Sequence, residues 1–454
     1  MKKPIFNTIG ICFIAMPLIL FSCKSDKSTA ETTRKAVDPQ LMSAIPFQDF
    51  DIDVSANDTI LLPEGTNIYI PKEAFVDGNG DEVRGKVQLH YRAFYTPGEI
   101  IASGITMQYD SAGQSHIFTS AGMFEMTGTQ NGKPISIAPK KSITMDFAST
   151  RNDMDYSFYK LDTATANWNF LSTTKVESNK LRENILNEIA ALITPKPMEP
   201  KALDGTKPVI DIDVDIDNHP ELAGYNGIVW QFGGTGNDPE QNKWIYNTNW
   251  NSAKLVMNDS ANCSYILNLS NKEKNFSTSV NPRFKGSDYT RALANFKTRM
   301  GSFEAEQKIR ELKEEQVKQI PQFNRTITMT GFGIHNCDMI YRYGRPAYVN
   351  AEFHFEDPQF EKQRENVTVY IISANGNLSM AYNALNQHNI FYLVDNSNCL
   401  IAVLKGTKRA CILSTADFKY SVENNASGLM SFKLQPSALQ VANGKDVDRV
   451  LRTL

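Results

Sequence analysis

The sequence predicts a mainly β protein with some α-helix: two β-sandwich-like regions, a linker helix and one long amphipathic helix in the C-terminal region. Short alternating runs of apolar and polar residues, broken by Gly, Asp and Asn, recur from about residue 47 to 175 and again after residue 208. Apolar residues at helical spacing lie between these regions and once more inside the second. With 454 residues, the chain is long enough for two or three domains.

Residues 1–22 have the composition of a secretory leader. Two lysines follow the initial Met, and residues 5–21 form a mostly apolar stretch of signal-peptide length. The run Leu20-Phe21-Ser22-Cys23 resembles a bacterial lipobox. In that lipoprotein family the leader is cut before the cysteine and the thiol is lipidated, so the resemblance implies lipidation of Cys23. The alternative is an ordinary secretory leader or a single membrane-spanning anchor. Pro17 argues against this alternative because it breaks the apolar run.

Residues 23–45 are predicted to be a flexible tether, because they are mostly small and polar and the next aromatic residue is Phe47. In lipoproteins of this kind an Asp directly after the cysteine favours the inner membrane, whereas this chain has Lys24 there. The resemblance therefore implies a lipid anchor in the outer membrane, facing the periplasm or the surface. No second apolar run reaches the ~18 residues of a membrane span.

The charge balance excludes nucleic acid as a predicted partner. The leader holds two of the 47 Lys and Arg residues and none of the 50 Asp and Glu residues, so the remaining chain is slightly acidic. A slightly acidic chain has no basic field to attract phosphates.

Residues 46–175 are predicted to form a β-sandwich domain. The clearest expected strands are 68–70, 87–94, 123–127 and 143–147, followed by a hairpin of 156–161 with 167–171. Trp168 is expected to be a buried anchor of this hairpin. The runs GTNIYIPKEAF at 65–75 and SAGMFE at 120–125 resemble ZU5-like β-sandwich modules. This likeness implies a fold and no partner, because the Ser-Pro and paired-valine signature of that family is missing.

Residues 176–208 are predicted to be a helix followed by a Pro-rich linker. Apolar residues at 181, 185, 189 and 192 have helical spacing, and the run TPKP at 194–197 ends the helix. Prolines continue to Pro208 and make the segment stiff. We therefore place a domain boundary within 195–208.

Residues 209–454 are predicted to be a β-rich domain that contains one long helix at about 287–319. The apolar seam of this helix has alternating steps of four and three, at residues 289, 293, 296, 300 and 303. After Gly301 the seam fades into charged sequence, and Pro321 stops the helix. We expect this apolar seam either to pack on its own domain or to bind a partner protein. The runs FGIHNCD at 332–338 and PEL at 220–222 with Trp230 resemble bacterial envelope lipoproteins, which implies location and fold but no activity.

Four cysteines follow Cys23, at positions 263, 337, 399 and 411, and allow two disulfides or four free thiols. Residues 400–404 and 410–413 are expected to form a hairpin in which Cys411 lies opposite Val403. Cys399 would then lie about 13 Å from Cys411, beyond the ~7 Å that a disulfide spans. No Cys-x-x-Cys spacing indicates zinc or redox chemistry.

No residue is predicted to be catalytic, to bind a metal ion or to hold a cofactor. The alternating acids of 211–217 form a line on a strand and not the shell that calcium needs, and 77–82 is expected to be a hairpin turn because Glu82 occupies the glycine position of an EF-hand. His335, Cys337 and Asp338 lie along one strand, which cannot place a base opposite a nucleophile. We expect His335 and Cys337 to be buried neighbours on one face. The question of enzymatic activity stays open, with the balance against it.

Three aromatic residues, Trp244, Tyr246 and Trp250, would share one face if the chain were extended there. Such a stripe can stack against sugar rings, or it can be the inner face of a sandwich. The sequence favours the inner face and leaves a glycan site as the second interpretation.

Four Asp-Ser/Thr-x triplets resemble acceptors of O-glycosylation in some bacterial periplasms. Their hydroxyl residues are Thr59, Ser111, Thr163 and Ser260. Each triplet also suits a turn leading into a strand, so both interpretations stay open.

Together these observations predict a lipid-anchored envelope protein with a non-catalytic binding or scaffolding role. The expected partners are the membrane, through the lipid, and envelope proteins or glycans. A glycan-binding or glycan-hydrolysing surface lipoprotein is the alternative function.

Overall fold

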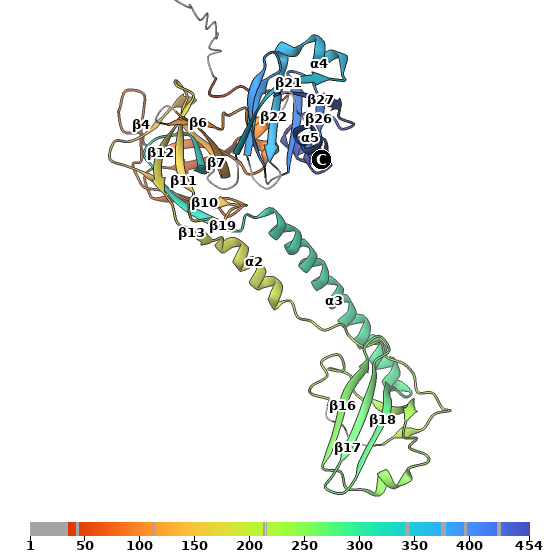
Figure 1. Cartoon of the computed structure of the whole chain (residues 1–454). Helices are drawn as coiled ribbons and strands as arrows, with labels where there is room; N and C mark the ends of the chain where they lie inside the picture. Colours follow the sequence, from red (N-terminus) through yellow and green to blue (C-terminus); the bar gives the residue numbers. More distant parts are fainter. Residues whose placement is uncertain are drawn as a thin grey trace, which may run out of the picture. The chain divides into compact units, whose positions relative to one another are not determined.

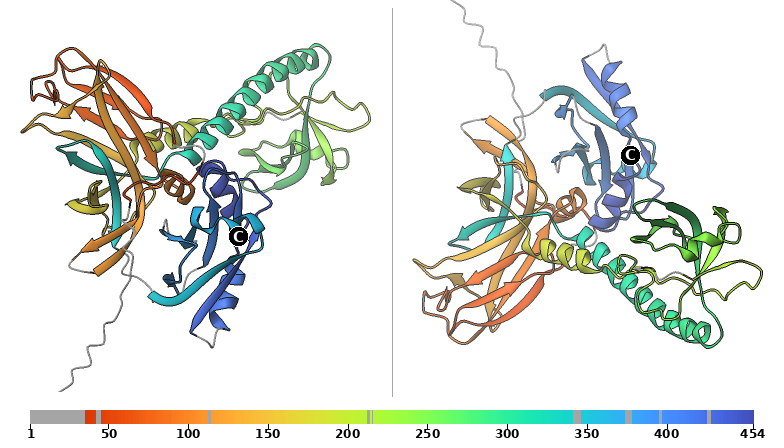
Figure 2. Two further views of the ribbon diagram at one scale, coloured as in Figure 1. Left: turned by 90° about the horizontal axis from the view of Figure 1, so that it is seen from above. Right: turned by 90° about the horizontal axis from the view of Figure 1, so that it is seen from below.

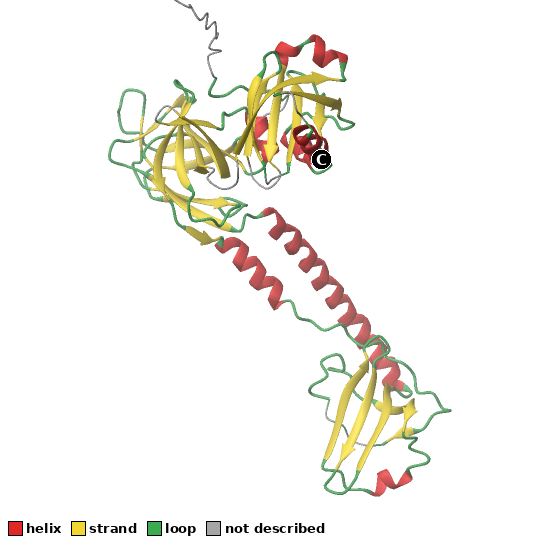
Figure 3. Ribbon diagram, in the orientation of Figure 1, coloured by secondary structure: helices red, strands yellow, loops and turns green. Residues whose placement is uncertain are grey.

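The computed structural model describes residues 35–454 except for 42–44, 112–113, 212–213, 215, 341–345, 374–377, 395–396 and 425–427. Strands account for 43% and helices for 21%, which confirms the predicted mainly β fold with some α-helix (Figures 1 and 3). Cys23 and the leader lie outside the described residues. None of the helices within that part of the chain is long and apolar enough to span a membrane.

Two sheets pack face to face in the first part of the fold. The larger has the order β1-β5-β7-β20-β11-β12, with β6 and β8 on β7, and the smaller has the order β13-β19-β10-β3-β2. The strands of the larger sheet are β1 (Gln48–Asp53), β5 (Lys86–Phe94), β6 (Gln108–Ser111), β7 (Gln114–Gln130), β8 (Lys133–Pro134), β11 (Ser157–Asp162), β12 (Asn167–Thr173) and β20 (Gly333–Ile340). Those of the smaller sheet are β2 (Asp58–Leu61), β3 (Asn67–Ile70), β10 (Ile143–Ser149), β13 (Val176–Ser178) and β19 (Phe323–Met329); β4 (Phe75–Val76) pairs with β9 (Ser136–Ile137).

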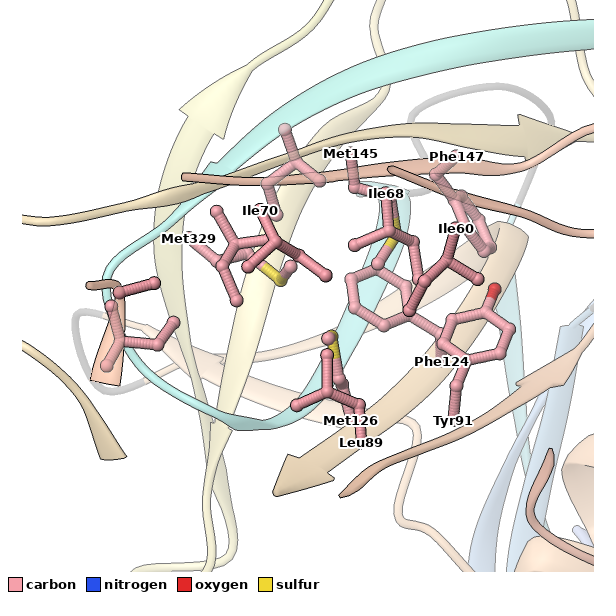
Figure 4. Packing of buried hydrophobic residues seen from close by; sticks show 14 of the residues in the cluster. Ile60, Ile68, Ile70, Leu89, Tyr91, Phe124, Met126, Met145, Phe147 and Met329 are labelled. Carbon is pink, nitrogen blue, oxygen red and sulfur yellow. The ribbon is translucent and has the colours of Figure 1, made fainter. Parts of the chain in front are cut away.

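Side chains alternate between the two faces of each strand, and those on the inner faces form the core between the two sheets. Leu89, Phe124 and Met126 of the larger sheet face Ile68 and Met145 of the smaller one (Figure 4). Every one of these side chains is fully buried. The period-2 pattern that predicted the strands therefore also selects the residues of this core.

Two strands that follow the long helix in sequence complete both sheets. β19 pairs with β10 over seven residues, and β20 lies between β7 and β11. Figure 2 shows these teal strands among the orange and yellow strands of the N-terminal region. The sandwich is therefore closed by a segment more than a hundred residues away, at 323–340.

The larger sheet curls into a nearly closed barrel. A side chain completes the seam between β12 and β6: Asn167 Oδ1 accepts from the Asp110 amide, and Asn167 Nδ2 donates to the Asp110 carbonyl, both at 2.9 Å. An asparagine amide presents the same donor and acceptor pair as a peptide group, so it replaces a pair of ladder bonds. Trp168 fills the interior, and its Nε1 donates to the Thr106 carbonyl at 2.9 Å. The expected hairpin and its buried tryptophan are confirmed.

The C-terminal part is a seven-stranded sheet of order β23-β22-β25-β26-β27-β21-β24. Its elements are β21 (Pro346–Phe355), α4 (Pro358–Lys362), η2 (Arg364–Asn366), β22 (Val367–Ser373), β23 (Leu378–Asn383), β24 (His388–Leu393), β25 (Asn398–Leu404), β26 (Ala410–Leu413), α5 (Thr415–Glu423), β27 (Leu429–Pro436) and α6 (Gly444–Leu451). The expected hairpin of β25 and β26 forms, but its predicted register is wrong by one residue. Cys411 lies opposite Ala402, because Leu404 accepts the amide of Thr407 and so belongs to the turn.

Helix α1 (Pro97–Ser103) joins this sheet to the sandwich. Asp448 of α6 accepts from Thr96 Oγ1 at 2.6 Å and from the Gly98 amide at 2.8 Å, so it caps the N-terminus of α1. A Cβ on Gly98 would collide with the carbonyl oxygen of Gly444. Glycine is therefore required where these two helices meet.

Helices α2 (Lys180–Ala191) and α3 (Ser287–Gln319) pair side by side. The observed bounds of α3 confirm the predicted helix at 287–319. Each helix supplies an arginine to the carbonyl end of the other: Arg182 donates to the carbonyls of Val317 and Ile320, and Arg310 donates to that of Leu192. A guanidinium at a helix C-terminus satisfies free carbonyls and complements the helix dipole. We call α2 and residues 306–319 of α3 the arm.

A separate five-stranded sheet lies between α2 and α3 in sequence, with the order β14-β15-β18-β17-β16. Its elements are β14 (Val209–Ile210), β15 (Val229–Gly236), η1 (Lys243–Asn247), β16 (Ser252–Asp259), β17 (Ser264–Ser270) and β18 (Asn275–Arg283). Its apolar core takes residues from Met198 to Phe296, so the first turns of α3 pack on this sheet. We call residues 198–299 the head.

Candidate functional site

The three aromatic residues singled out from the sequence meet in the head, but not as expected. Trp244 and Tyr246 lie on η1 and Trp250 lies three residues beyond its end, so the extended run is wrong. Local polar contacts explain the turn: Asn242 Nδ2 donates to the Asp238 carbonyl and Thr248 Oγ1 donates to the Trp244 carbonyl, both at 2.9 Å. Side chains that bond to nearby backbone compete with a strand ladder.

Packing nevertheless brings the rings together. The ring centroids of Trp244 and Trp250 lie 5.9 Å apart, and Phe276 of β18 meets Trp244 edge-on at 6.1 Å. Trp250 is half-buried against the head core, whereas Trp244 is 38% and Tyr246 42% exposed. We call Trp244, Tyr246 and Trp250 the aromatic tip. It has one buried member and two that face water.

Hydrogen bonds fix each ring of the aromatic tip. Trp244 Nε1 donates to Asn242 Oδ1 at 3.1 Å, and Trp250 Nε1 donates to the Ile245 carbonyl at 3.0 Å. Tyr246 donates its hydroxyl to the Val209 carbonyl at 3.0 Å. A ring held in place loses little conformational entropy when a ligand stacks on it.

Charged groups of both signs border the aromatic tip. The ammonium of Lys274 lies 5.1 Å from the Trp244 ring centroid, within cation–π range. Burial raises the pKa of Tyr246, and the carboxylates of Glu240 and Asp211 raise it further. The tip therefore offers apolar ring faces, a cation and nearby carboxylates. Lys274 and Phe276 come from β18 and its turn, and no local signal in the sequence connects them to Trp244.

Trp244 lies at the end of the head sheet that is remote from α3, whereas the Tyr246 hydroxyl reaches the Val209 carbonyl of β14. β18 begins beside Trp244, through Phe276, and ends at Arg283, four residues before α3 starts. Seven residue steps at 3.3 Å span about 23 Å. The exposed ring of Trp244 is therefore separated from the start of α3 by most of the length of β18.

The second group of chemically capable residues, on β20, is buried throughout. His335 is 1% exposed, and Cys337 and Asp338 are completely buried, because one core covers each face of this strand. His335 stacks on Phe124 with centroids 5.0 Å apart, and Cys337 lies in the same core. The expectation of buried neighbours on one face is confirmed.

We call His335, Cys337 and Asp338 the polar row. Burial also makes the polar row chemically inert. Desolvation and the nearby Lys160 lower the pKa of His335 to about 3. Desolvation raises the pKa of Cys337, and it raises the pKa of Asp338 well above the ordinary value. His335 and Cys337 are consequently neutral at neutral pH, and burial favours the protonated form of Asp338. The Asp338 carboxyl group accepts a hydrogen bond from Asn336 Nδ2. Asn336 Oδ1 in turn accepts one from Ser120 Oγ at 2.9 Å. The row acts as interior polar packing and offers no nucleophile to a substrate.

The turn at 77–82 and the acidic run at 211–217 are candidates for calcium sites on their sequence alone. Residues 77–82 form the expected turn, in which Asp77 Oδ1 accepts from the amides of Asn79 and Asp81. Three residues of the acidic run, 212, 213 and 215, lie outside the described residues. Within the part of the chain that the structure describes, no group of three His, Cys, Asp or Glu residues can hold a metal ion.

All four described cysteines are free thiols. Cys399 and Cys411 are buried, and desolvation raises the pKa of each to about 12. In the observed register Cys399 lies three residues from the partner of Cys411, roughly 10 Å along the strand. The argument against this disulfide therefore survives the shift in register.

Two of the four hydroxyl triplets occupy equivalent hairpin loops. Asp162 Oδ1 accepts from the Ala164 amide between β11 and β12, and Asp259 Oδ1 accepts from the Ala261 amide between β16 and β17, both at 2.9 Å. The fifth residue of each loop, Ala166 or Cys263, has a positive φ near 50°. Thr163 and Ser260 are exposed in these loops, Thr59 is exposed on β2, and Ser111 is half-buried at the end of β6.

No protein family matches this chain, and neither curated proteins nor solved structures give a match.

Proposed function

We propose that this protein is a lipid-anchored protein of the bacterial outer membrane with a non-catalytic binding role, and that the aromatic tip is its contact surface. The lipobox pattern at Cys23 supports the anchor, and the polar run at 23–45 supports a tether behind it. The observation that carries the binding role is the exposure of Trp244 and Tyr246, fixed by hydrogen bonds. Exposed, well-held aromatic side chains are typical anchors of interfaces.

The non-catalytic part of the proposal is supported by where the reactive residue types lie. His335, Cys337 and Asp338 are buried away from water, so they are not placed to exchange protons with a substrate in solution. The two exposed members of the aromatic tip supply stacking and hydrogen bonding, which are binding interactions.

Photo-crosslinking in the native envelope tests this function. A photoreactive amino acid replaces Tyr246 and, in a matched control, Tyr420, which is 70% exposed on α5. We expect a crosslinked product from position 246 and none from position 420. Equal products from both positions, or none from 246, would mean that the aromatic tip is not the contact surface.

The anchor is tested independently by Cys23→Ala. The variant should leave the membrane fraction, because one cysteine carries the acyl chains and acyl chains supply the membrane affinity. Unchanged partitioning would exclude the lipid anchor and would leave the crosslinking result intact.

Glycan binding is the second candidate, favoured by the exposed ring of Trp244 beside Lys274 and Asn242. Retention on immobilised polysaccharides should fall at least about tenfold in Trp244→Ala, which corresponds to about 1.4 kcal/mol. Hydrolysis would need Asp211 and Glu240 as well, so loss of cleavage in Asp211→Asn or Glu240→Gln separates a hydrolase from a binder.

A further inference from the structure

Helix α3 is anchored at both of its ends but not in the middle. On the head side, Arg299 donates to the carbonyls of Ala223 and Pro220, and its guanidinium lies 5.2 Å from the Tyr225 ring centroid. On the arm side, the first anchor is Glu306, which accepts from the Thr194 amide at 3.0 Å. Between them, no side chain of residues 300–305 forms a hydrogen bond or ion pair with another element of the described chain.

The stretch without such bonds also contains the single glycine of α3. Gly301 is exposed, and a Cβ at this position would meet nothing within 4 Å, so packing does not require glycine there. Glycine inside a helix costs about 1 kcal/mol relative to alanine. Two hydroxyls bond back to the preceding turn at 3.3 Å, from Thr298 to Ala294 and from Ser302 to Thr298. Such bonds bend helices, and kinks occur at Gly/Ser pairs.

The chain enters the head through residues 194–198, which run beside the same stretch of α3. Thr194 is tied to Glu306 of the arm, whereas Met198 is buried in the head core and its carbonyl accepts from the Tyr225 hydroxyl at 2.6 Å. We call residues 194–198 the strap. Two of its three inner residues are prolines, which keep it stiff.

The lengths of the two connections limit any bending. Seven helical residues from Arg299 to Glu306 rise about 10 Å, whereas four extended steps of the strap reach at most about 14 Å. The strap therefore has only a few ångströms of slack. It permits a change of angle and prevents the head from separating from the arm.

We propose that α3 bends at residues 300–303, and that the strap limits the bend, so that the head changes its orientation relative to the arm. Trp244 lies at the far end of β18, at most about 45 Å from this point when the lengths of α3 and β18 are added. A bend of about 20° therefore moves Trp244 by no more than about 15 Å. The movement requires no ligand and lets an anchored protein search for a partner.

Distances between two spin labels on the full chain in detergent test the hinge. One label replaces Val256, exposed on β16 of the head, and the other replaces Leu312, exposed on α3 of the arm. Cys263→Ala removes the half-buried native thiol, and Ala166 occupies the equivalent loop position with the same backbone conformation. Wild type should give a broad distance distribution, because bent and straight forms coexist.

Three changes separate the hinge from general flexibility. Gly301→Ala should reduce the bent population about fivefold, the factor equivalent to about 1 kcal/mol. Inserting Gly-Ser-Gly-Ser between Pro195 and Lys196 should broaden the distribution, because the strap no longer limits the bend. Ala294→Gly places glycine in the anchored part of α3 and should leave the distribution unchanged.

The proposal is overturned by a single narrow distance in wild type that Gly301→Ala does not alter. It is equally overturned if only the strap insertion has an effect, since the bend then lies outside α3, or if Ala294→Gly broadens the distribution as much as the insertion does. Circular dichroism of each variant confirms that the helix is retained, so a loss of fold is distinguished from a change in hinge.

Discussion

The polar row on β20 and the aromatic tip of the head contain opposite kinds of chemistry in opposite environments. The row holds residue types that enzymes use, yet cores on both faces of the strand exclude water from His335, Cys337 and Asp338. The tip holds residue types that usually fill cores, yet Trp244 and Tyr246 face water. The difference teaches that solvent access, and not residue type, decides which group can meet a partner.

The largest effect is expected in the core beneath the polar row. Phe124→Ala removes a fully buried ring that stacks on His335 and packs against Phe147, so it should lower the free energy of unfolding by about 3–5 kcal/mol. The matched control is Phe170→Ala on β12 of the same sheet, where the ring is exposed and the loss should be within about 1 kcal/mol. Chemical denaturation measures both. Similar losses would mean that the β20 region is not the tightly packed part of the fold.

Acid should destabilise the protein through His335. Its pKa is about 3 in the fold and 6.5 ordinarily, so below pH 6.5 the unfolded state binds a proton that the folded state does not. Stability is then lost at about 1.4 kcal/mol per pH unit as pH falls toward 3. His335→Phe removes this term, so its unfolding free energy relative to wild type should rise by about 2–3 kcal/mol between pH 7.5 and pH 4.5.

The control for this pH dependence is His354→Phe, which changes a histidine exposed on β21. The same rise in unfolding free energy for His354→Phe, or no rise for His335→Phe, would show that protons reach His335 in the folded protein. The difference in solvent access between β20 and the aromatic tip would then be contradicted. Asp338 acts in the opposite direction, because its raised pKa removes stability as pH rises above 3.8.

A smaller effect on stability is expected at the aromatic tip. Trp244→Ala should cost about 1 kcal/mol, since the ring is already partly hydrated. The lost contacts include those with Trp250, Phe276, Lys274 and Asn242. Thermal unfolding measures the change. A loss as large as that of Phe124→Ala would show that Trp244 belongs to the head core, which was the interpretation that the sequence favoured.

The smallest effect on the fold is expected from the hydroxyl loops. We propose that Thr163 and Ser260 accept O-linked glycans, because both are exposed in equivalent hairpin turns; Thr59 and Ser111 are the further candidates. Mass spectrometry of protein from the native host should show added mass that Thr163→Val with Ser260→Ala reduces, with unfolding unchanged. A mass equal to that of the unmodified lipoprotein would exclude the modification.

Local sequence patterns predicted the elements better than their partners. Apolar spacing placed α3 at its observed bounds, and alternation with turn residues placed the β11–β12 hairpin around Trp168. The shared face of Trp244, Tyr246 and Trp250 depended on an extended run, and residues 243–247 form a turn instead, because parity alone does not show that Asn242 and Thr248 bond to nearby carbonyls. The one-residue slip at Cys411 has the same origin, since turn contacts set the register.

By itself, the sequence determined the bounds of α3 and the strand-rich character of the chain, because the periods of 2 and 3.6 are properties of neighbouring residues. It also supplied the basis for proposing a lipid anchor at Cys23. It did not predict the short helices α1, α5 and α6. Only the tertiary structure decided that β19 and β20 close the sandwich, that Lys274 and Phe276 join the aromatic tip, and that water reaches Trp244 but not Asp338. Strand pairing and burial depend on distant residues that come together only in the fold, and no local pattern contains that information.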